Sequence, residues 1–343
     1  MGWCGWKQVC LFLLSTPAVS SRSALLEEQL PPNMHLPTSL FLMPLAAQAV
    51  NVLQSNDDGW AEKNLRVFYY SLVDAGFDSI ISAPAENQSG RSSLDAPPTE
   101  VDDGCEFNSC PPGSPPTGRN ESMPRFNAQK GEEELIDPQY VNSYPVTAMK
   151  YGINTLSEEF FGGEPDIAVA GPNVGSNLGI ITQFSGTVGA AVEAVKQGIP
   201  AIAFSGSSGS QTAWNAPLET YMSTYADLST TLTQAVVNSG TPYLPGDVFL
   251  NVNYPEIGDN CRKPSDFKFV LSRVNIAVPF VTPDDVETCG NDGRLPNERD
   301  VIGTDGCYAS VSVGDANDKT TAGIKAQRVV LGKLQSILSC LPE

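Results

Sequence analysis

The stretch from residue 166 to residue 179 reads DIAVAGPNVGSNLG and is the clearest pointer to the fold. Its opening, Asp166–Ala170, is a short apolar run typical of a fully buried strand. A loop rich in Gly and Asn follows, then a helical pattern from about Thr187 to Gln197, then a second apolar run at Ala201–Phe204. A strand, a crossover helix and another strand make up the unit from which parallel sheets are built.

The same alternation continues on both sides of that stretch. On the N-terminal side, Val50–Ser55 and Phe77–Ala83 have strand patterns, and Ala61–Ala75 between them has apolar residues at helical spacing. Further helices are expected near 146–156 and 221–238, with a strand at 248–252. The sequence therefore predicts an α/β fold with a Rossmann-like, three-layer parallel sheet as its core.

Three segments are expected along the chain. Residues 1–49 resemble a leader, residues 50–253 form the α/β core, and residues 254–343 form a β-rich extension of the same domain, packed on the core or on a partner subunit. Residues 95–140 interrupt the core as an irregular insertion rich in Pro and Gly. The extension is expected to end in an amphipathic helix near Gln327–Leu338.

Two secretory signals are expected in the leader. One begins at Met1; the other begins at Met34 and ends in Ala47-Gln48-Ala49, an A-x-A cleavage pattern. The second is preferred because the folded domain is expected to start at Val50, which makes residues 1–33 an over-extended gene start. An N-terminal anchor is the alternative, but both apolar runs are shorter than the roughly 20 residues of a spanning helix. We therefore expect a secreted protein that is not held in a membrane.

The cysteines fit an oxidising compartment. Of the eight in the chain, Cys4 and Cys10 lie in the leader, which leaves an even number. Cys105 and Cys110 are expected to form a local disulfide, whereas Cys261, Cys289, Cys307 and Cys340 allow three pairings that the sequence does not separate. No C-x-x-C spacing supports metal binding instead. Asn120-Glu121-Ser122 is an N-glycosylation sequon, so a glycoprotein is expected.

Charge and histidine content exclude several classes of function. The 343 residues include 20 Lys+Arg and 39 Asp+Glu, a net charge of −19, which argues against binding polymeric nucleic acid or an anionic membrane. The single histidine, His35, lies in the leader. Ser-His-Asp triads, Cys-His sites, histidine phosphatases and multi-His zinc sites are therefore excluded. Catalysis must use carboxylates, hydroxyls, amides, Lys or Arg, or a metal held by oxygen.

Three polar segments follow predicted strands, namely Ser55–Gly59, Asn87–Gly90 and Gly171–Gly179. In an open parallel sheet, ligands bind at the carboxyl ends of the strands. Carboxylate, hydroxyl and amide oxygens gathered there suit Mg²⁺, Mn²⁺ or Ca²⁺. Ser185-Gly186-Thr187 at a helix start would cradle a phosphate. Each segment alone is an ordinary turn or helix cap, but together they indicate metal-assisted hydrolysis of a phosphoester.

These motifs resemble, in order and approximate spacing, those of the SurE survival-protein family. The resemblance includes Gly198–Ala203 and a late segment at Thr304–Val313, and so covers most of residues 50–313. The insertion and the cysteine-bearing tail are similar to the secreted fungal branch, which is described as acid phosphatases. The family consists of metal-dependent phosphatases acting on nucleoside 5′- and 3′-monophosphates and, in some members, short polyphosphate.

The resemblance also implies site residues. Carried over by position, the metal ligands would be Asp57, Asp58, Ser89 and Asn173, and the phosphate pocket would be lined by Asn177, Ser185, Gly186 and Thr187. Asp57, Asp58, Asn56 and Asn177 would form the catalytic group, with Asn56 beside the metal. Asn87-Gln88-Ser89 is also a formal N-glycosylation sequon. We expect Asn87 to be unmodified, because a glycan there would obstruct the site.

One part of the family pattern is missing from this chain. Family members commonly dimerise through a C-terminal arm, which predicts a homodimer, and some place an Asp/His pair near the active site. No histidine follows His35, so that pair is not carried over. Bound water or a carboxylic acid is left as the proton donor.

Two other readings remain open. One is a phosphatase with Asp57 as nucleophile, although Gly59 stands where such sites usually carry a second acid. The other is a degenerate binding protein without activity, whose expected mark is a lost metal ligand, yet all four are present. The negative charge favours small phosphate monoesters over long polyphosphate as substrates.

Overall fold

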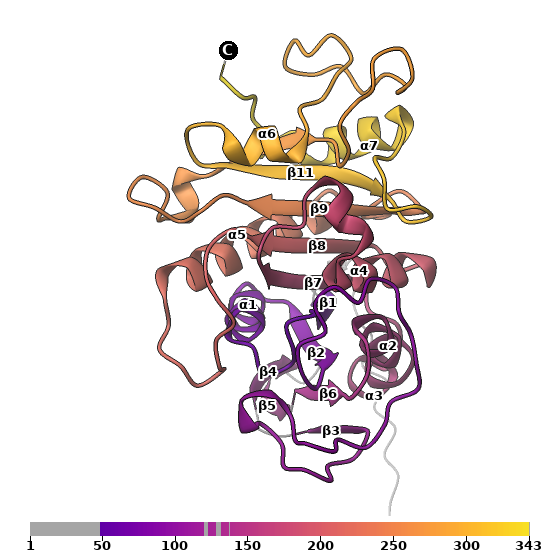
Figure 1. Ribbon diagram of the computed structural model, residues 1–343, viewed down its shortest axis with the longest axis vertical. Helices are drawn as coiled ribbons and strands as arrows, with labels where there is room; N and C mark the ends of the chain where they lie inside the picture. Colours follow the sequence, from indigo (N-terminus) through magenta and orange to yellow (C-terminus); the bar gives the residue numbers. More distant parts are fainter. Residues whose placement is uncertain (1–48, 120–122, 128–131, 137, 343) are drawn as a thin grey trace, which may run out of the picture. The chain divides into compact units, whose positions relative to one another are not determined.

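A sheet of nine strands runs through the computed structural model, in the order β10-β11-β9-β8-β7-β1-β2-β6-β3 (Figure 1). The structure describes residues 49–119, 123–127, 132–136 and 138–342, with side chains described outside 120–137. The leader and the Asn120 sequon lie outside these residues. The strands are β1 Asn51–Ser55, β2 Asp78–Pro84, β3 Thr117–Arg119, β6 Gln139–Val141, β7 Ile167–Val174, β8 Ala201–Gly206, β9 Val248–Tyr254, β10 Lys268–Ser272 and β11 Tyr308–Asp315.

The central strands β2, β1, β7, β8 and β9 are parallel, as the sequence predicts. The helices between them also agree with the predicted pattern, with two differences in extent. The helix expected at 146–156 continues through a π-helical turn into a further helix, and the last helix starts and ends earlier than expected. The helices are α1 Lys63–Asp74, α2 Pro145–Tyr151, α3 Ser157–Phe161, α4 Gly186–Lys196, α5 Thr220–Asn238, α6 Glu298–Gly303 and α7 Ile324–Leu334.

Apolar side chains fill both faces of the sheet. On one face, α1, α5 and α7 pack on residues such as Val52, Ile202 and Leu250. On the other face, α2 and α4 pack on Leu53, Ala168 and neighbouring small residues. Figure 1 shows α1 and α2 on opposite sides of β1 and β2. Because strands buried on both faces have apolar residues at successive positions, the continuous apolar runs of the sequence correctly predict the three-layer core.

The insertion is more regular than the sequence suggests. Its β6 pairs in parallel with β2, β3 pairs antiparallel with β6, and β4 (Met123–Asn127) and β5 (Glu132–Ile136) form a separate hairpin. The expectation of a wholly irregular segment is therefore wrong. Strands of three residues such as β3 are too short to show an alternating pattern. Gly118 in β3 lies so close to Tyr140 of β6 that a Cβ atom would come within 2.4 Å of its hydroxyl.

The C-terminal extension packs on the core and widens its sheet. β11 pairs antiparallel with β9, and β10 pairs in parallel with β11. Disulfides join Cys261 to Cys307 and Cys289 to Cys340, which selects one of the three open pairings. The expected disulfide between Cys105 and Cys110 is also formed. In the described part of the chain, no helix is long and apolar enough to cross a membrane.

Candidate active site

The three predicted polar segments meet at one edge of the sheet. β2, β1 and β7 are neighbours and run in the same direction, so the loops that follow Ser55 and Pro84 and the end of β7 lie beside one another. The start of α4 lies against the same edge, because a Cβ atom on Gly186 would come within 2.7 Å of the Asp57 Cβ atom. Glycine at position 186 is therefore a requirement of this close approach. The three segments thus lie together at the strand ends, as the strand-end rule predicts.

Asp57 is 2% exposed and is held by hydrogen bonds from the start of α4 and from the loop after β2. The Thr187 hydroxyl donates to Asp57 Oδ1 at 2.5 Å, and the Gln88 N–H donates to the Asp57 carbonyl at 2.7 Å. Burial raises the pKa of the Asp57 carboxyl, and the hydrogen bonds from Thr187 oppose that rise. The carboxylate is thus fixed in orientation but poorly solvated.

Asp58 is 1% exposed and points toward β7. Its Oδ2 accepts a hydrogen bond from the Val174 N–H at 2.7 Å, and its Oδ1 accepts one from Gln211 Nε2 at 3.3 Å. Burial and then the neighbouring charge of Asp57 raise the pKa of Asp58 well above its ordinary value, while a hydrogen bond from the Ser89 hydroxyl lowers it. Among the described residues, no Lys or Arg forms an ion pair with either aspartate.

Asn173, near the end of β7, and Asn177, in the loop that follows it, also lie at the candidate site. The Asn173 amide nitrogen donates to the carbonyls of Val174 and Gly175, the latter at 2.6 Å, which leaves its Oδ1 available as a ligand. The Asn177 amide nitrogen donates to the Ser205 hydroxyl at 2.8 Å and to Thr187 Oγ1 at 3.4 Å. Asn177 is thereby linked through Thr187 to Asp57.

Ser185 and Asn56 make further hydrogen bonds at the candidate site. Ser185 is the N-cap of α4, where its hydroxyl accepts a hydrogen bond from the Val188 N–H at 3.1 Å. Asn56 Oδ1 accepts a hydrogen bond from the Gly59 N–H at 3.1 Å, whereas its buried Nδ2 has no hydrogen-bond partner in the described part of the chain. A buried donor without a partner is costly, so the Asn56 amide is suited to an acceptor such as a phosphate oxygen.

Comparisons with known proteins show the family of the chain. The family profile described as "Survival protein SurE" matches residues 52–274. The chain belongs to the SurE family. An acid phosphatase from Yarrowia lipolytica is 30% identical over 320 residues, which are 85% of this chain and 86% of that protein. The 5′-nucleotidase SurE of Lawsonia intracellularis is 32% identical over 213 residues, 61% of this chain and 67% of that one. The crystal structure of the SurE protein from Aquifex aeolicus covers 82% of this chain and 98% of its own, with 21% identity and a TM-score of 0.48.

Within this SurE chain, sequence reasoning missed two side chains that contact the aspartate turn. Gln211 reaches Asp58 from the loop after β8. Glu106 comes from the insertion, where its Oε1 accepts a hydrogen bond from the Ala61 N–H at 3.0 Å and packs on Gly59. Burial raises the pKa of Glu106 to about 8, and the charge of Asp58 contributes. Neither residue belongs to a recognisable sequence motif. The one signal is the Cys105/Cys110 pair, which flanks Glu106.

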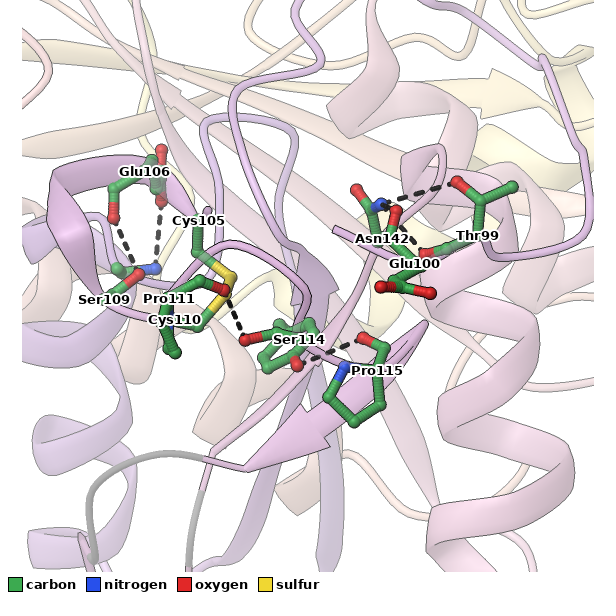
Figure 2. Close-up of a disulfide and its surroundings, with 12 residues drawn as sticks. Thr99, Glu100, Cys105, Glu106, Ser109, Cys110, Pro111, Ser114, Pro115 and Asn142 are labelled. Carbon is green, nitrogen blue, oxygen red and sulfur yellow. Dashed lines mark hydrogen bonds between the residues drawn. A yellow bond between two sulfur atoms is a disulfide. The ribbon is translucent and has the colours of Figure 1, made fainter. Parts of the chain in front are cut away.

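The turn that carries Glu106 is closed covalently. Figure 2 shows Glu106 beside the Cys105–Cys110 disulfide, with Ser109 donating through its N–H and its hydroxyl to the Glu106 carbonyl. Ser114 donates to the Pro111 carbonyl in the same loop, and Asn142 donates to the Thr99 carbonyl. The insertion thus presents Glu106 to the SurE site on a tightly constrained loop.

The donor set of the site fits a hard divalent cation. Two buried adjacent carboxylates without a positive neighbour are costly, and a cation would offset that cost. The described residues contain no cluster of three or more His, Cys, Asp or Glu side chains that could hold a metal. A cation held by Asp57 and Asp58 would therefore also depend on the hydroxyl of Ser89 and the amide oxygen of Asn173, which are oxygen ligands of the kind Mg²⁺ and Mn²⁺ accept.

Proposed function

We propose that this protein is a secreted, divalent-cation-dependent hydrolase of phosphate monoesters, acting on nucleoside 5′- or 3′-monophosphates or other small monoesters. The observation that carries the proposal is the pair Asp57 and Asp58, buried side by side next to the start of α4, with no Lys or Arg of the described residues paired to either. The names of the relatives, an acid phosphatase and a 5′-nucleotidase, support the same reaction class.

Four residues would hold the cation, namely Asp57, Asp58, Ser89 and Asn173. When bound, Mg²⁺ or Mn²⁺, with Ca²⁺ as a third candidate, supplies a Lewis acid that polarises the phosphoryl oxygen and makes water more acidic. Thr187 keeps Asp57 oriented through its 2.5 Å hydrogen bond, and the Val174 N–H does the same for Asp58. Both contacts fix the carboxylates before substrate arrives, which reduces the reorganisation that binding requires.

The phosphate would bind to donors that surround the aspartates. Asn56 Nδ2 is a buried amide donor with no partner among the described residues, and Asn177 Nδ2 would become a second donor by giving up its 3.4 Å hydrogen bond to Thr187 Oγ1. Ser185, Gly186 and Thr187 lie at the start of α4, where the helix dipole favours an anion. The Ser185 N–H donates to the Ile181 carbonyl, so at Ser185 the hydroxyl is the group offered to the phosphate. Because no histidine follows His35, the leaving oxygen takes its proton from water at the mouth of the site, where Ser89 and Gln211 are exposed.

Two features outside the site bear on location and assembly. Three disulfides are the usual mark of an oxidising compartment, which supports secretion. In the C-terminal extension, Ile276, Val278, Phe280 and Val281 are exposed apolar side chains on one loop. Such a loop is suited to a second copy of the chain, so we include a homodimer through the extension in the proposal.

The test is a phosphate-release assay on the mature protein with a nucleoside monophosphate, with added Mg²⁺ or Mn²⁺ and again with EDTA. We expect EDTA to abolish release. Asp57→Asn and Asp58→Asn should each lower kcat/KM by ~100-fold or more, because cation affinity or positioning is lost. Asp74→Asn, an exposed aspartate at the end of α1, is the matched control and should change little.

Several outcomes would contradict this assignment. An absence of metal-dependent release between about pH 4 and 8 would reject the activity, and binding of phosphate without turnover would indicate a degenerate binding protein. Near-normal rates in both aspartate variants would place the site elsewhere. A trapped phosphoaspartate at Asp57 would show that Asp57, and not water, attacks the phosphate.

A further inference from the structure

A buried polar network lies under the turn Asn177–Gly179 of the candidate site. Two asparagines of β9, Asn251 and Asn253, are fully buried on the same face of the strand. Asn253 Oδ1 accepts a hydrogen bond from the Asn177 N–H at 2.8 Å, and its Nδ2 donates to the Asn177 carbonyl at 3.2 Å. Asn251 Nδ2 donates to the same carbonyl at 2.9 Å. The backbone of Asn177 is thus held on both its polar groups.

Glu298 extends this network from the C-terminal extension. It is the first residue of α6 and is 1% exposed. Its Oε2 accepts a hydrogen bond from the Gly179 N–H at 3.0 Å, and its Oε1 accepts one from Asn251 Nδ2 at 2.6 Å. Among the described residues it forms no ion pair. A buried carboxyl is costly unless its oxygens are hydrogen-bonded, and here its partners hold a loop of the site.

The turn held by this network carries a residue that faces the site. Asn177 donates to Ser205 and Thr187, and Thr187 in turn donates to Asp57. Gly179 has φ +56°, in the left-handed region, so the turn depends on a glycine and on correct support of its backbone. A displacement of the turn would therefore move the Asn177 amide directly and Asp57 only through Thr187.

We propose that Glu298 is a positioning residue for phosphate binding. Through Asn251 and the Gly179 N–H it fixes the turn so that the Asn177 amide stays beside Thr187, from where it would donate to the phosphate, while the residues that would hold the cation keep their own supports. This inference rests on the proposed phosphomonoesterase function. It assigns to the C-terminal extension a role in substrate binding that is separate from any role in dimer formation.

The experiment compares Glu298→Ala and Glu298→Gln with wild type in the mature protein. Gln keeps the side-chain volume and one acceptor oxygen, so it should fold even where Ala does not. The matched control is Asp300→Asn, an exposed acid on the same helix. We expect KM for p-nitrophenyl phosphate and the inhibition constant of inorganic phosphate to rise about tenfold in Glu298→Ala and less in Glu298→Gln, with the activation constant for Mg²⁺ changed less than twofold.

Hydrogen exchange provides a readout that does not need activity. Exchange of the Gly179 amide should be at least about tenfold faster in Glu298→Ala, because its acceptor is gone, while the Val188 amide at the start of α4 should not change. An inactive wild type would reject the proposed function and leave the exchange result to decide the positioning role. Unchanged KM, phosphate inhibition and Gly179 exchange would overturn the inference, as would a parallel loss of Mg²⁺ activation.

Discussion

The insertion and the C-terminal extension both form hydrogen bonds to the candidate site, but they hold different parts of it in place. The insertion reaches the Asp57–Gly59 turn through Glu106, whose own turn is closed by a disulfide over five residues of sequence. The extension reaches the loop after β7 through Glu298 and through Lys319. One support is local and covalent, whereas the other consists of buried hydrogen bonds between residues far apart in sequence.

Lys319 shows how the extension holds a second point on that loop. Its carbonyl accepts hydrogen bonds from the side chains of Thr182 and Gln183, both at 3.2 Å. Its ammonium donates to the Ser92 hydroxyl at 3.1 Å, and Ser92 donates to the Gln183 carbonyl at 2.5 Å. The insertion thus supports the carboxylates that would hold the cation, and the extension supports the groups that would hold the phosphate.

The largest expected difference between the two segments is in how Glu298 and Glu106 make the stability of the fold depend on pH. Burial raises the pKa of both Glu298 and Glu106 to about 8 from an ordinary value of 4.5. Such a group stabilises the fold fully below pH 4.5, and this contribution is lost as the pH rises through about 8. Glu298→Gln should flatten the decline in the free energy of unfolding by up to ~1.4 kcal/mol per pH unit. Glu106→Gln should flatten it less, because Glu106 is only half-buried.

Urea unfolding at a series of pH values between 4 and 9, with EDTA present, measures both slopes. Asp300→Asn should leave the slope as in wild type, since that residue is exposed. Equal flattening in the two glutamate variants would mean that the insertion is as tightly packed at Glu106 as the extension is at Glu298. Unchanged slopes would show that both carboxyls ionise freely in the folded protein.

Removal of the Glu106 side chain should affect activity through the cation. In Glu106→Ala the Ala61 N–H loses its acceptor and the space beside Gly59 is vacated, so the aspartate turn is less well fixed. We expect kcat/KM to fall about tenfold, with a matching rise in the Mg²⁺ activation constant. Glu100→Ala, an exposed glutamate in the same insertion, is the control. A change in phosphate inhibition without a change in Mg²⁺ activation would reverse the roles assigned to the two segments.

The α/β core and the meeting of the polar segments at one edge of the sheet could be predicted because both follow from local patterns. The runs at Asp166–Ala170 and Ala201–Phe204 are apolar because strands buried on both faces must be. Parallel strands bring their carboxyl ends to one edge, so the polar residues after β1, β2 and β7 had to meet. The residues of the site itself, such as Asp57 and Thr187, therefore lie in motifs that the sequence displays.

The contacts that hold the candidate site in place could not be predicted, because none of them corresponds to a local sequence pattern. Glu298 is one acid among many in an acidic chain, and nothing beside it in sequence shows that Gly179 needs an acceptor. Glu106 begins a 3-10 helix of only three residues, which is too short to show a periodic pattern in the sequence. The pairing of Cys261 with Cys307 depends on β10 and β11 joining the sheet side by side, which is a fact of tertiary structure.

The smallest effect is expected at Lys319, which tests whether the extension acts through its backbone or through its charge. Lys319 is 6% exposed, and burial lowers the pKa of its ammonium to about 8, with Lys196 contributing. In Lys319→Met the carbonyl still accepts from Thr182 and Gln183, so kcat/KM should fall only about twofold. Stability at pH 7 should not fall, because a buried positive charge is removed.

The sign of the pH effect provides an independent check on Lys319. A lysine with a lowered pKa makes the folded state more stable as the pH rises from about 8 toward 10.5, since only the unfolded chain still binds the proton there. Lys319→Met should lack this rise, and Lys325→Met, which removes the same charge from an exposed position, should keep it. If Lys319→Met lowered kcat/KM by more than about tenfold, the ammonium itself would act on the phosphate side of the site. The extension would then contribute a positive charge to phosphate binding as well as backbone support. It would differ from the insertion in the chemistry it supplies and not only in the part of the site it supports.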